Sequence, residues 1–153
     1  MKTLSDRVLL DTNVLVHLIR GGIVGTQIAS DHDLLQRSER PLISIATVGE
    51  LHALAMKWNW GTEKQRKLDE LVSELVVIHL GQGAVIALYA AINNFCEREI
   101  TPAHPIGQND MWIAATASAT DATLLTTDHD FDHLSPRFIK LAKIDPKTGG
   151  AAA

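Results

Sequence analysis

The sequence has few of the features that would place it outside the ordinary soluble globular class. It contains one cysteine, Cys96, so no internal disulfide can form, as is usual in a reducing cytoplasm. No apolar run reaches the roughly 20 residues needed to cross a bilayer, and residues 1–7 lack the apolar core of a signal peptide. We therefore expect a cytoplasmic protein with Cys96 as a buried thiol on a helix.

The chain also lacks the excess of basic residues that is typical of proteins that bind nucleic acids. Its 14 Lys and Arg residues against 18 Asp and Glu residues give a net charge of −4, whereas phosphate binding usually needs a basic face. Setting aside the four acidic residues of the candidate site described below leaves 14 acids, which balance the 14 basic residues. Any contact with nucleic acid must then be local, and we expect its affinity to depend on a bound metal ion.

What is present indicates a single α/β domain. The 153 residues are 46% hydrophobic and 21% charged, which is ordinary for one globular domain. We expect this domain to cover residues 1–146, followed by a disordered tail, rich in Gly and Ala, at 147–153.

Short apolar runs alternate with helical patterns along the whole chain. The runs predict strands at 8–10, 42–44, 76–78, 122–127 and 138–144. The 3.6-residue patterns predict helices at 12–20, 24–37, 47–58, 63–75 and 84–98, and one that opens at 110. This alternation predicts an α/β fold with a mostly parallel central sheet.

Four acidic residues stand near junctions between these predicted strands and helices. Asp11 and Asp128 each end a strand, Asp110 opens a helix, and Glu50 interrupts an otherwise apolar helix face. The carboxyl ends of parallel strands share one edge of a sheet, so we expect these side chains to converge there. One such acid alone would serve as a helix N-cap, which contributes about 0.5–2 kcal/mol. All four together indicate a divalent metal site, and phosphodiester hydrolysis is the chemistry that such a site favours.

Two other small α/β classes fit the acids less well. A receiver domain needs an acidic pair after the first strand and an acid after the third, but the third ends Ile78-His79-Leu80. A haloacid-dehalogenase-like phosphatase needs a second Asp two residues after the first, and position 13 is Asn. Composition leaves open a metal-independent ribonuclease that uses two of the seven His residues. A non-catalytic protein-binding module is the other alternative, and the intact set of four acids argues against it.

Four segments of the chain resemble the signature blocks of PIN-domain ribonucleases, in the order and spacing of that family. They most resemble the VapC toxins of bacterial toxin–antitoxin pairs. The segments are 9–16 (LLDTNVLV), 44–51 (SIATVGEL), 108–117 (QNDMWIAATA) and 124–131 (LLTTDHDF). The resemblance implies a three-layer α/β/α sandwich (PIN-like) over residues 1–146 and an endoribonuclease that uses Mg²⁺ or Mn²⁺. It also implies an RNA substrate, a cognate antitoxin protein as partner, and a homodimer.

By position, the resemblance assigns the metal site to Asp11, Glu50, Asp110 and Asp128. Mg²⁺ prefers a few carboxylates and several waters, one of which can act as the nucleophile. We expect Asp11 and Asp110 to bind the principal ion directly. Glu50 and Asp128 are expected to act through water or to hold a second ion.

Neighbouring polar residues are candidates for supporting roles. Thr12, Asn13 and Thr126 could orient the carboxylates or bound water by hydrogen bonds, although capping and turn formation would also explain them. Asp130 is a possible auxiliary ligand, with the N-cap of a short turn as its alternative role.

Aromatic and basic residues gather around the end of the third predicted helix. Trp58 and Trp60 fit either core packing or a contact with an antitoxin or a second copy of the chain. The following basic residues would ordinarily form a solvated helix face, and RNA phosphates are the alternative contact; they are Lys57, Lys64, Arg66 and Lys67.

Overall fold

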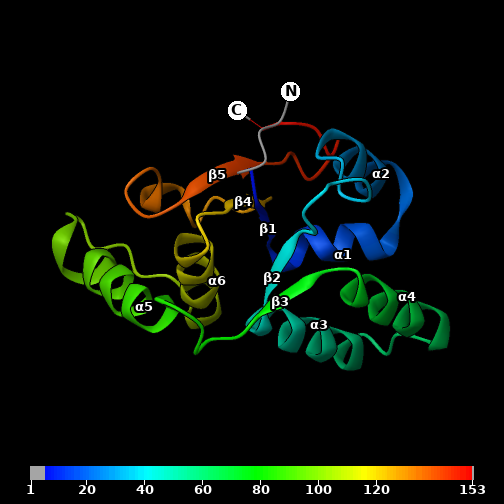
Figure 1. Ribbon diagram of the computed structural model, residues 1–153, viewed down its shortest axis with the longest axis horizontal. Helices are drawn as coiled ribbons and strands as arrows, with labels where there is room; N and C mark the ends of the chain where they lie inside the picture. Colours follow the sequence, from blue (N-terminus) through cyan, green and yellow to red (C-terminus); the bar gives the residue numbers. More distant parts are fainter. Residues whose placement is uncertain (1–5, 153) are drawn as a thin grey trace.

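The protein, described here over residues 6–152 of a computed structural model, has a parallel sheet between two layers of helices (Figure 1). The strands are β1 (Val8–Leu10), β2 (Leu42–Ser44), β3 (Val76–Ile78), β4 (Thr123–Thr126) and β5 (Lys140–Lys143). They lie in the order β3-β2-β1-β4-β5, and each adjacent pair is parallel. The predicted three-layer α/β/α fold is confirmed.

The helices follow the strands in the alternation that the sequence predicts. They are α1 (Thr12–Arg20), α2 (Gly22–Asp31), α3 (Ile45–Lys57), α4 (Thr62–Ser73), α5 (Val85–Asn94) and α6 (Gln108–Ala119). A π-helical turn, Phe95–Glu99, follows α5, and a 3₁₀ turn spans Asp132–Leu134. None of the described helices is long and apolar enough to cross a membrane.

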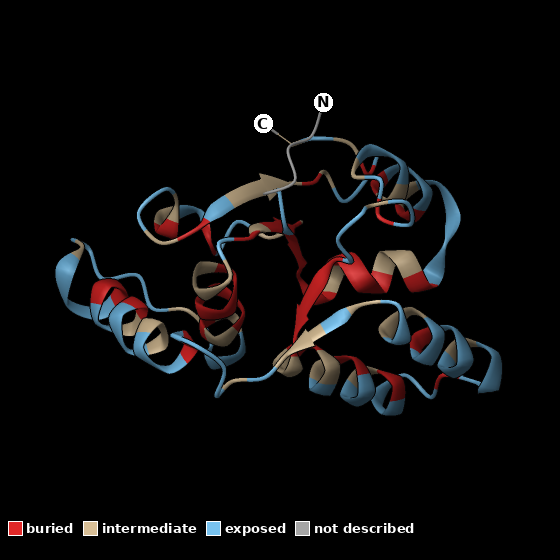
Figure 2. Cartoon of the chain, in the orientation of Figure 1, coloured by how far each residue is buried: buried red, intermediate tan, exposed pale blue. Residues whose placement is uncertain are grey.

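The central strands β1, β2 and β4 are buried on both faces, whereas the edge strands β3 and β5 are partly exposed. Successive residues of a strand point to opposite sides of the sheet and so pack against different helices. Leu9 and Leu124 pack with residues of α5 and α6 on one face. Leu10 and Leu125 pack with residues of α1, α2, α3 and α4 on the other. Figure 2 shows this burial along the central strands and on the helix sides that face them. The middle residues of the strands are therefore apolar, and polar residues such as Ser44, Thr126 and Lys143 stand at the strand ends.

The strand order reverses at β1. The chain passes from β1 outward to β2 and β3, and then crosses to β4 on the other side of β1. In a sheet of this kind, the crevice beyond the carboxyl ends of the two strands at the reversal is the usual binding site. Asp11 directly follows β1 and Asp128 lies two residues after the end of β4, so both reach this crevice.

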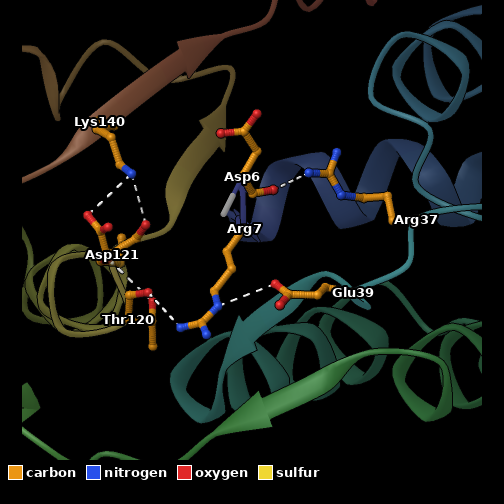
Figure 3. A network of polar contacts seen from close by, with 8 residues as sticks. Asp6, Arg7, Arg37, Glu39, Thr120, Asp121 and Lys140 are labelled. Carbon is orange, nitrogen blue, oxygen red and sulfur yellow. Dashed lines mark hydrogen bonds and ion pairs between the residues drawn. The ribbon is translucent and has the colours of Figure 1, made fainter. Parts of the chain in front are cut away.

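The opposite edge of the sheet is closed by polar contacts between segments that are distant in sequence (Figure 3). Just before β1, Arg7 pairs with Glu39 (Nε–Oε2 3.3 Å) and donates to the Thr120 carbonyl oxygen at 3.3 Å. At the start of β5, Lys140 Nζ lies 3.2 Å from the Asp121 carboxylate and 2.9 Å from the Asp121 carbonyl oxygen. These contacts join the amino ends of β1, β4 and β5, and leave the carboxyl edge for the acidic residues.

Several helix boundaries differ from the predicted ones for local reasons. Helix α3 begins at Ile45, because the Ser44 side chain accepts a hydrogen bond from the Ala46 N–H at 3.1 Å. Glu50 therefore lies in the second turn of α3. Helix α2 ends at Asp31, and Asp33 adopts a left-handed conformation (φ 49°) that a continuous helix would not allow. Cys96 is buried as predicted, within the π-helical turn.

The expected disorder of the tail is not what the structure shows for residues 147–152. The chain turns after Asp145, whose N–H donates to the Gly150 carbonyl oxygen at 2.8 Å, and Ala151 forms an antiparallel bridge with Ile144. Gly149 has a positive φ of 79°, and a Cβ there would lie 2.4 Å from the Val24 carbonyl oxygen of α2. The glycines that suggested disorder allow a tight turn that packs against α2. The predicted domain limit at 146 therefore cuts through a hydrogen-bonded turn.

Candidate metal centre

Asp11 is a buried carboxylate at the junction of β1 and α1. It is the N-cap of α1 and only 3% exposed. Its Oδ1 accepts a hydrogen bond from the Thr12 N–H at 2.7 Å, and its Oδ2 accepts one from the Thr126 hydroxyl at 2.7 Å. Each oxygen thus has one partner and a further lone pair available. The N-cap interpretation is confirmed for this residue, and its role in a metal site stays a prediction.

Thr126 connects the ends of β1 and β4. Its hydroxyl donates to Asp11 and accepts a hydrogen bond from the Asp128 N–H at 2.9 Å. Asp128 Oδ1 in turn accepts a hydrogen bond from the Asp130 N–H at 2.9 Å. This chain of contacts fixes the turn after β4 relative to Asp11.

Asp110 reaches the same place from α6, where it lies in the first turn of the helix. Asp110, Asp128 and Asp130 each offer a carboxylate oxygen, and these oxygens all lie within 4.8 Å of one another. Asp110 and Asp128 are half-buried, whereas Asp130 is exposed. Three carboxylates this close are a suitable oxygen-donor set for a hard divalent cation.

Glu50 approaches from α3 and is held by Thr12. The Thr12 hydroxyl donates to Glu50 Oε1 at 2.8 Å and lies 3.2 Å from the hydroxyl of Thr47. The Thr12 side chain therefore orients a carboxylate, which is one of the two roles predicted for it. Thr47 was not among the predicted site residues, although it precedes Glu50 by one turn of the same helix.

The electrostatics of the site favour a positive occupant. Burial is the largest of several causes that together raise the pKa of Asp110 to about 7; the others are the nearby charges of Asp11, Asp128, Glu50 and Asp130, in that order. Burial also raises the pKa of Asp11 to about 6, against the opposing effect of its hydrogen bonds from Thr126 and Thr12. Crowded carboxylates resist ionisation unless a cation compensates them. The donor set and its charge fit Mg²⁺ or Mn²⁺, which keep several waters and bind through a few carboxylates.

All four predicted site acids line one pocket of about 350 Å³. Thr12 and Asn13 line it too, and the hydrogen-bonding role suggested for Asn13 stays a prediction. Thr126 and Asp130 reach the site through the contacts described above. Sequence reasoning missed His17 and Arg20, which also line the pocket. Their spacing from Asn13, four and seven residues along α1, was the available signal, because it places all three on one helix face.

These features define an α/β/α domain with an acidic cluster, a candidate site for a divalent cation, where the strand order reverses. The chain belongs to the PIN domain family, which matches residues 8–135. That match includes Asp11, Glu50, Asp110, Asp128 and Asp130.

Solved structures of toxin–antitoxin complexes share this fold. The chain is similar to a chain of VapBC2 from Rickettsia felis, bound in that crystal to a DNA fragment from the promoter. The identity is 26%, the TM-score is 0.74, and the match covers 89% of this chain and 97% of that one. VapBC-1 from nontypeable Haemophilus influenzae gives 24% identity and a TM-score of 0.71, with 89% and 96% covered. VapBC from Salmonella typhimurium gives 22% identity and a TM-score of 0.70, with 90% and 98% covered.

The last two similarities, below 25% identity, concern the fold alone. A comparison with curated protein sequences gave no significant match. The resemblance to VapC-like PIN toxins is confirmed by the family match and by the similarity to VapBC2 from Rickettsia felis, which together support a nuclease of the toxin type.

Proposed function

We propose that this protein is a metal-dependent endoribonuclease that hydrolyses RNA phosphodiester bonds as the toxin of a toxin–antitoxin pair. The observation that supports the proposal most is the convergence of acids from β1, α3, α6 and the turn after β4 on one pocket. No single element supplies more than two of them. A purely structural role would not require carboxylates from four segments at one point.

In this proposal the aspartates serve the metal ion, and Glu50 positions a water molecule in the pocket. Asp110 is the central ligand, since it lies with Asp128 and Asp130 and its pKa is also raised by the charge of Asp11. When bound, Mg²⁺ or Mn²⁺ lowers the pKa of a bound water and polarises the phosphoryl oxygen. Hydrogen bonds from the Thr12 N–H and the Thr126 hydroxyl hold the Asp11 carboxylate in position. Glu50 Oε1 accepts from Thr12, which leaves its other oxygen to accept a hydrogen bond from water in the pocket.

The test of the reaction is cleavage of RNA by the purified protein and analysis of the product ends. Cleavage should require Mg²⁺ or Mn²⁺, stop with EDTA, and leave 5′-phosphate and 3′-hydroxyl ends. Asp110→Asn should abolish it, whereas His129→Gln, at an exposed His outside the pocket, should not. Cleavage in EDTA that leaves 2′,3′-cyclic phosphate ends would favour the His-pair alternative. A folded protein that cleaves no RNA under any of these conditions would favour the non-catalytic module.

We also propose that a cognate antitoxin inhibits the protein and that two copies of the chain form a homodimer in the cytoplasm. The acidic pocket suits a basic residue from the antitoxin, and Arg can bind a carboxylate through two hydrogen bonds. Such a partner would place Arg or Lys near Asp11 and Asp110, and would cover apolar surface near Trp58 or Trp60. The complex should therefore cleave RNA far more slowly than the free protein. Equal cleavage by the complex and by the free protein would contradict this inhibition.

A further inference from the structure

The pocket that holds the acids continues along α1 toward the ends of α1 and α3. Beyond the acids it is lined by His17, Arg20, Leu54 and Trp58. Arg20 lies nine residues after Asp11, so the two are about 13 Å apart along the helix axis at 1.5 Å per residue. The pocket therefore extends far enough beyond the acids to receive a nucleotide next to the one whose phosphate they would bind.

The far end of the pocket is formed by a cation and an aromatic ring in contact. The Arg20 guanidinium carbon lies 5.5 Å from the centroid of the Trp58 ring. Trp58 is 45% exposed, and the buried Trp60 lies beside it with ring centroids 6.3 Å apart. The indole is thus fixed by two neighbours while nearly half of it faces solvent. A cation over a ring is a favourable contact that positions both groups.

Arg20 is available to pair with an anion. Among residues 6–152, no carboxylate forms an ion pair with the Arg20 guanidinium. His17, one turn earlier on α1, has a pKa lowered by burial and by the charge of Arg20. Near neutral pH the positive charge at this end of the pocket therefore belongs to Arg20. A cation of this kind beside an acidic cluster suits a ligand that carries more than one phosphate.

We propose that Arg20 and Trp58 form a subsite for a nucleotide that flanks the cleaved phosphate of single-stranded RNA. This inference rests on the proposed function of the same pocket. The Arg20 guanidinium pairs with the flanking phosphate, and the base of that nucleotide stacks on the exposed part of the Trp58 indole. Grooves that bind single strands combine such cations with aromatic rings on which bases stack. Paired bases of an RNA helix are not free to stack on a side chain, so the subsite selects unpaired RNA.

The test measures binding separately from cleavage. A labelled single-stranded oligoribonucleotide is titrated with Asp110→Asn protein in Mg²⁺ over a series of salt concentrations, with and without a second substitution. Trp58→Leu should weaken binding at least about fivefold at unchanged salt dependence, because it removes stacking and no charge. Arg20→Met should weaken binding and reduce the slope of log affinity against log salt by about 0.7, the value for one phosphate contact to a single strand.

Matched controls separate these effects from a general loss of folded structure. Arg66→Met removes an exposed Arg of α4 that is paired with Glu63 and Glu70, and should change neither affinity nor slope. Trp58→Phe keeps an aromatic face and should retain most of the affinity. Oligonucleotides with one abasic position, moved along the strand, should identify a position where the base contributes to binding by the parent protein but not by the Trp58→Leu protein.

Unchanged affinity and slope in both variants would overturn the subsite, and so would the absence of RNA binding by the Asp110→Asn protein. If both variants lost affinity as expected while the unsubstituted protein cleaved no RNA with Mg²⁺ or Mn²⁺, the subsite would stand and the proposed reaction would fail. If the protein cleaved RNA with metal but both variants bound normally, the reaction would stand and the subsite would fail. Arg20 and Trp58 would then belong to a contact with another protein.

Discussion

At the scale of single residues, Thr126 has more influence on the site than its small side chain suggests. Its buried hydroxyl donates to Asp11 at 2.7 Å and accepts from the Asp128 N–H at 2.9 Å. A buried carboxylate oxygen that loses its partner costs more than the hydrogen bond itself contributes. The residue thus stabilises both the fold and the ionised form of Asp11.

Thr126→Val should lower the free energy of unfolding by about 1–3 kcal/mol, because it leaves the buried Asp11 oxygen without its donor. It should also raise the pKa of Asp11, since the Thr126 hydrogen bond lowers that pKa. Thr116→Val is the matched control, because this buried hydroxyl donates only to the Trp112 carbonyl oxygen within α6. Urea unfolding with and without Mg²⁺ should show both variants destabilised and the Mg²⁺ effect reduced only in Thr126→Val. An equal Mg²⁺ effect in both would contradict the role given to Thr126.

The raised pKa values of Asp11 and Asp110 predict a dependence of stability on pH that reverses when metal is added. Between about pH 4, where an unfolded Asp titrates, and about pH 7, the folded metal-free protein binds more protons than the unfolded chain. These two groups therefore stabilise the metal-free fold at low pH, and that stabilisation is lost as the pH rises through about 6 to 7. Stabilisation by Mg²⁺ needs the ionised groups and should grow over the same range.

Thermal melts at pH 5 and pH 8, in EDTA and in Mg²⁺, measure this effect. The increase in Tm on adding Mg²⁺ should be larger at pH 8. Other acids titrate in the same range, so Asp110→Asn is the control, and its Mg²⁺ effect should be small at both pH values. A Mg²⁺ effect on the unsubstituted protein that is equal at pH 5 and pH 8 would contradict the assignment of these two acids.

At the scale of elements, α1 does most to shape the site. Its first residues hold Asp11 and Glu50 in place, and its exposed face continues through Asn13 and His17 to Arg20. Its other side packs on α2, where Gly25 lets the two helices approach closely. A Cβ at Gly25 would lie 2.5 Å from the His17 carbonyl oxygen, closer than real Cβ atoms come.

Gly25→Ala should therefore destabilise the protein by about 1–3 kcal/mol, since backbone must shift to admit the methyl group. Gly49→Ala on α3 is the control, because no atom lies within 4 Å of the added Cβ. It should raise the free energy of unfolding by about 0.5–1 kcal/mol through helix propensity. Urea midpoints of the two variants should move in opposite directions. A Gly25→Ala protein at least as stable as the parent would mean that α1 and α2 pack less tightly than described.

Sequence patterns predicted the elements well where local chemistry decides them, and less well where tertiary contacts do. The strands at 8–10, 42–44 and 76–78 match because each is a short apolar run. The end of α2 was missed because residues after Asp31 keep a helical spacing of apolar side chains, although Asp33 is left-handed. The order of the tail was missed because its contacts with α2 depend on the fold and not on its composition.

At the scale of the whole molecule, the two edges of the sheet have opposite character. The amino edge is tied by compensated pairs such as Arg7–Glu39 and Lys140–Asp121 (Figure 3). Among residues 6–152, the acids at the carboxyl edge form no such ion pairs, and the pKa values of Asp11 and Asp110 are raised there. The net charge of −4 equals the number of acids that sequence analysis assigned to that edge. The excess negative charge can therefore be assigned to the carboxyl edge, where a cation would compensate it, while the charges of the other residues balance.

The sequence was enough to predict that the acids meet at one edge of the sheet. It was not enough to predict which of their carboxylates lie closest together. The alternation of strands and helices was enough to bring Asp11, Asp110 and Asp128 to one edge. The place of Asp130 beside Asp110 depends on the turn after β4, in which its N–H donates to Asp128. That turn is built by Thr126, and no periodicity along the chain reveals it.

The central claim, that these acids form one divalent-cation site, is tested most directly by calorimetric titration of the purified protein with Mn²⁺ at pH 7.5. The unsubstituted protein should bind Mn²⁺, and Asp110→Asn and Asp128→Asn should each reduce the affinity at least about tenfold, by analogy with the loss of other metal-supporting groups. Glu39→Gln, which removes one acid from the opposite edge, should bind Mn²⁺ as the unsubstituted protein does. Equal Mn²⁺ binding by all four proteins would contradict the account, because the ion would then sit elsewhere and the acids would serve only the fold.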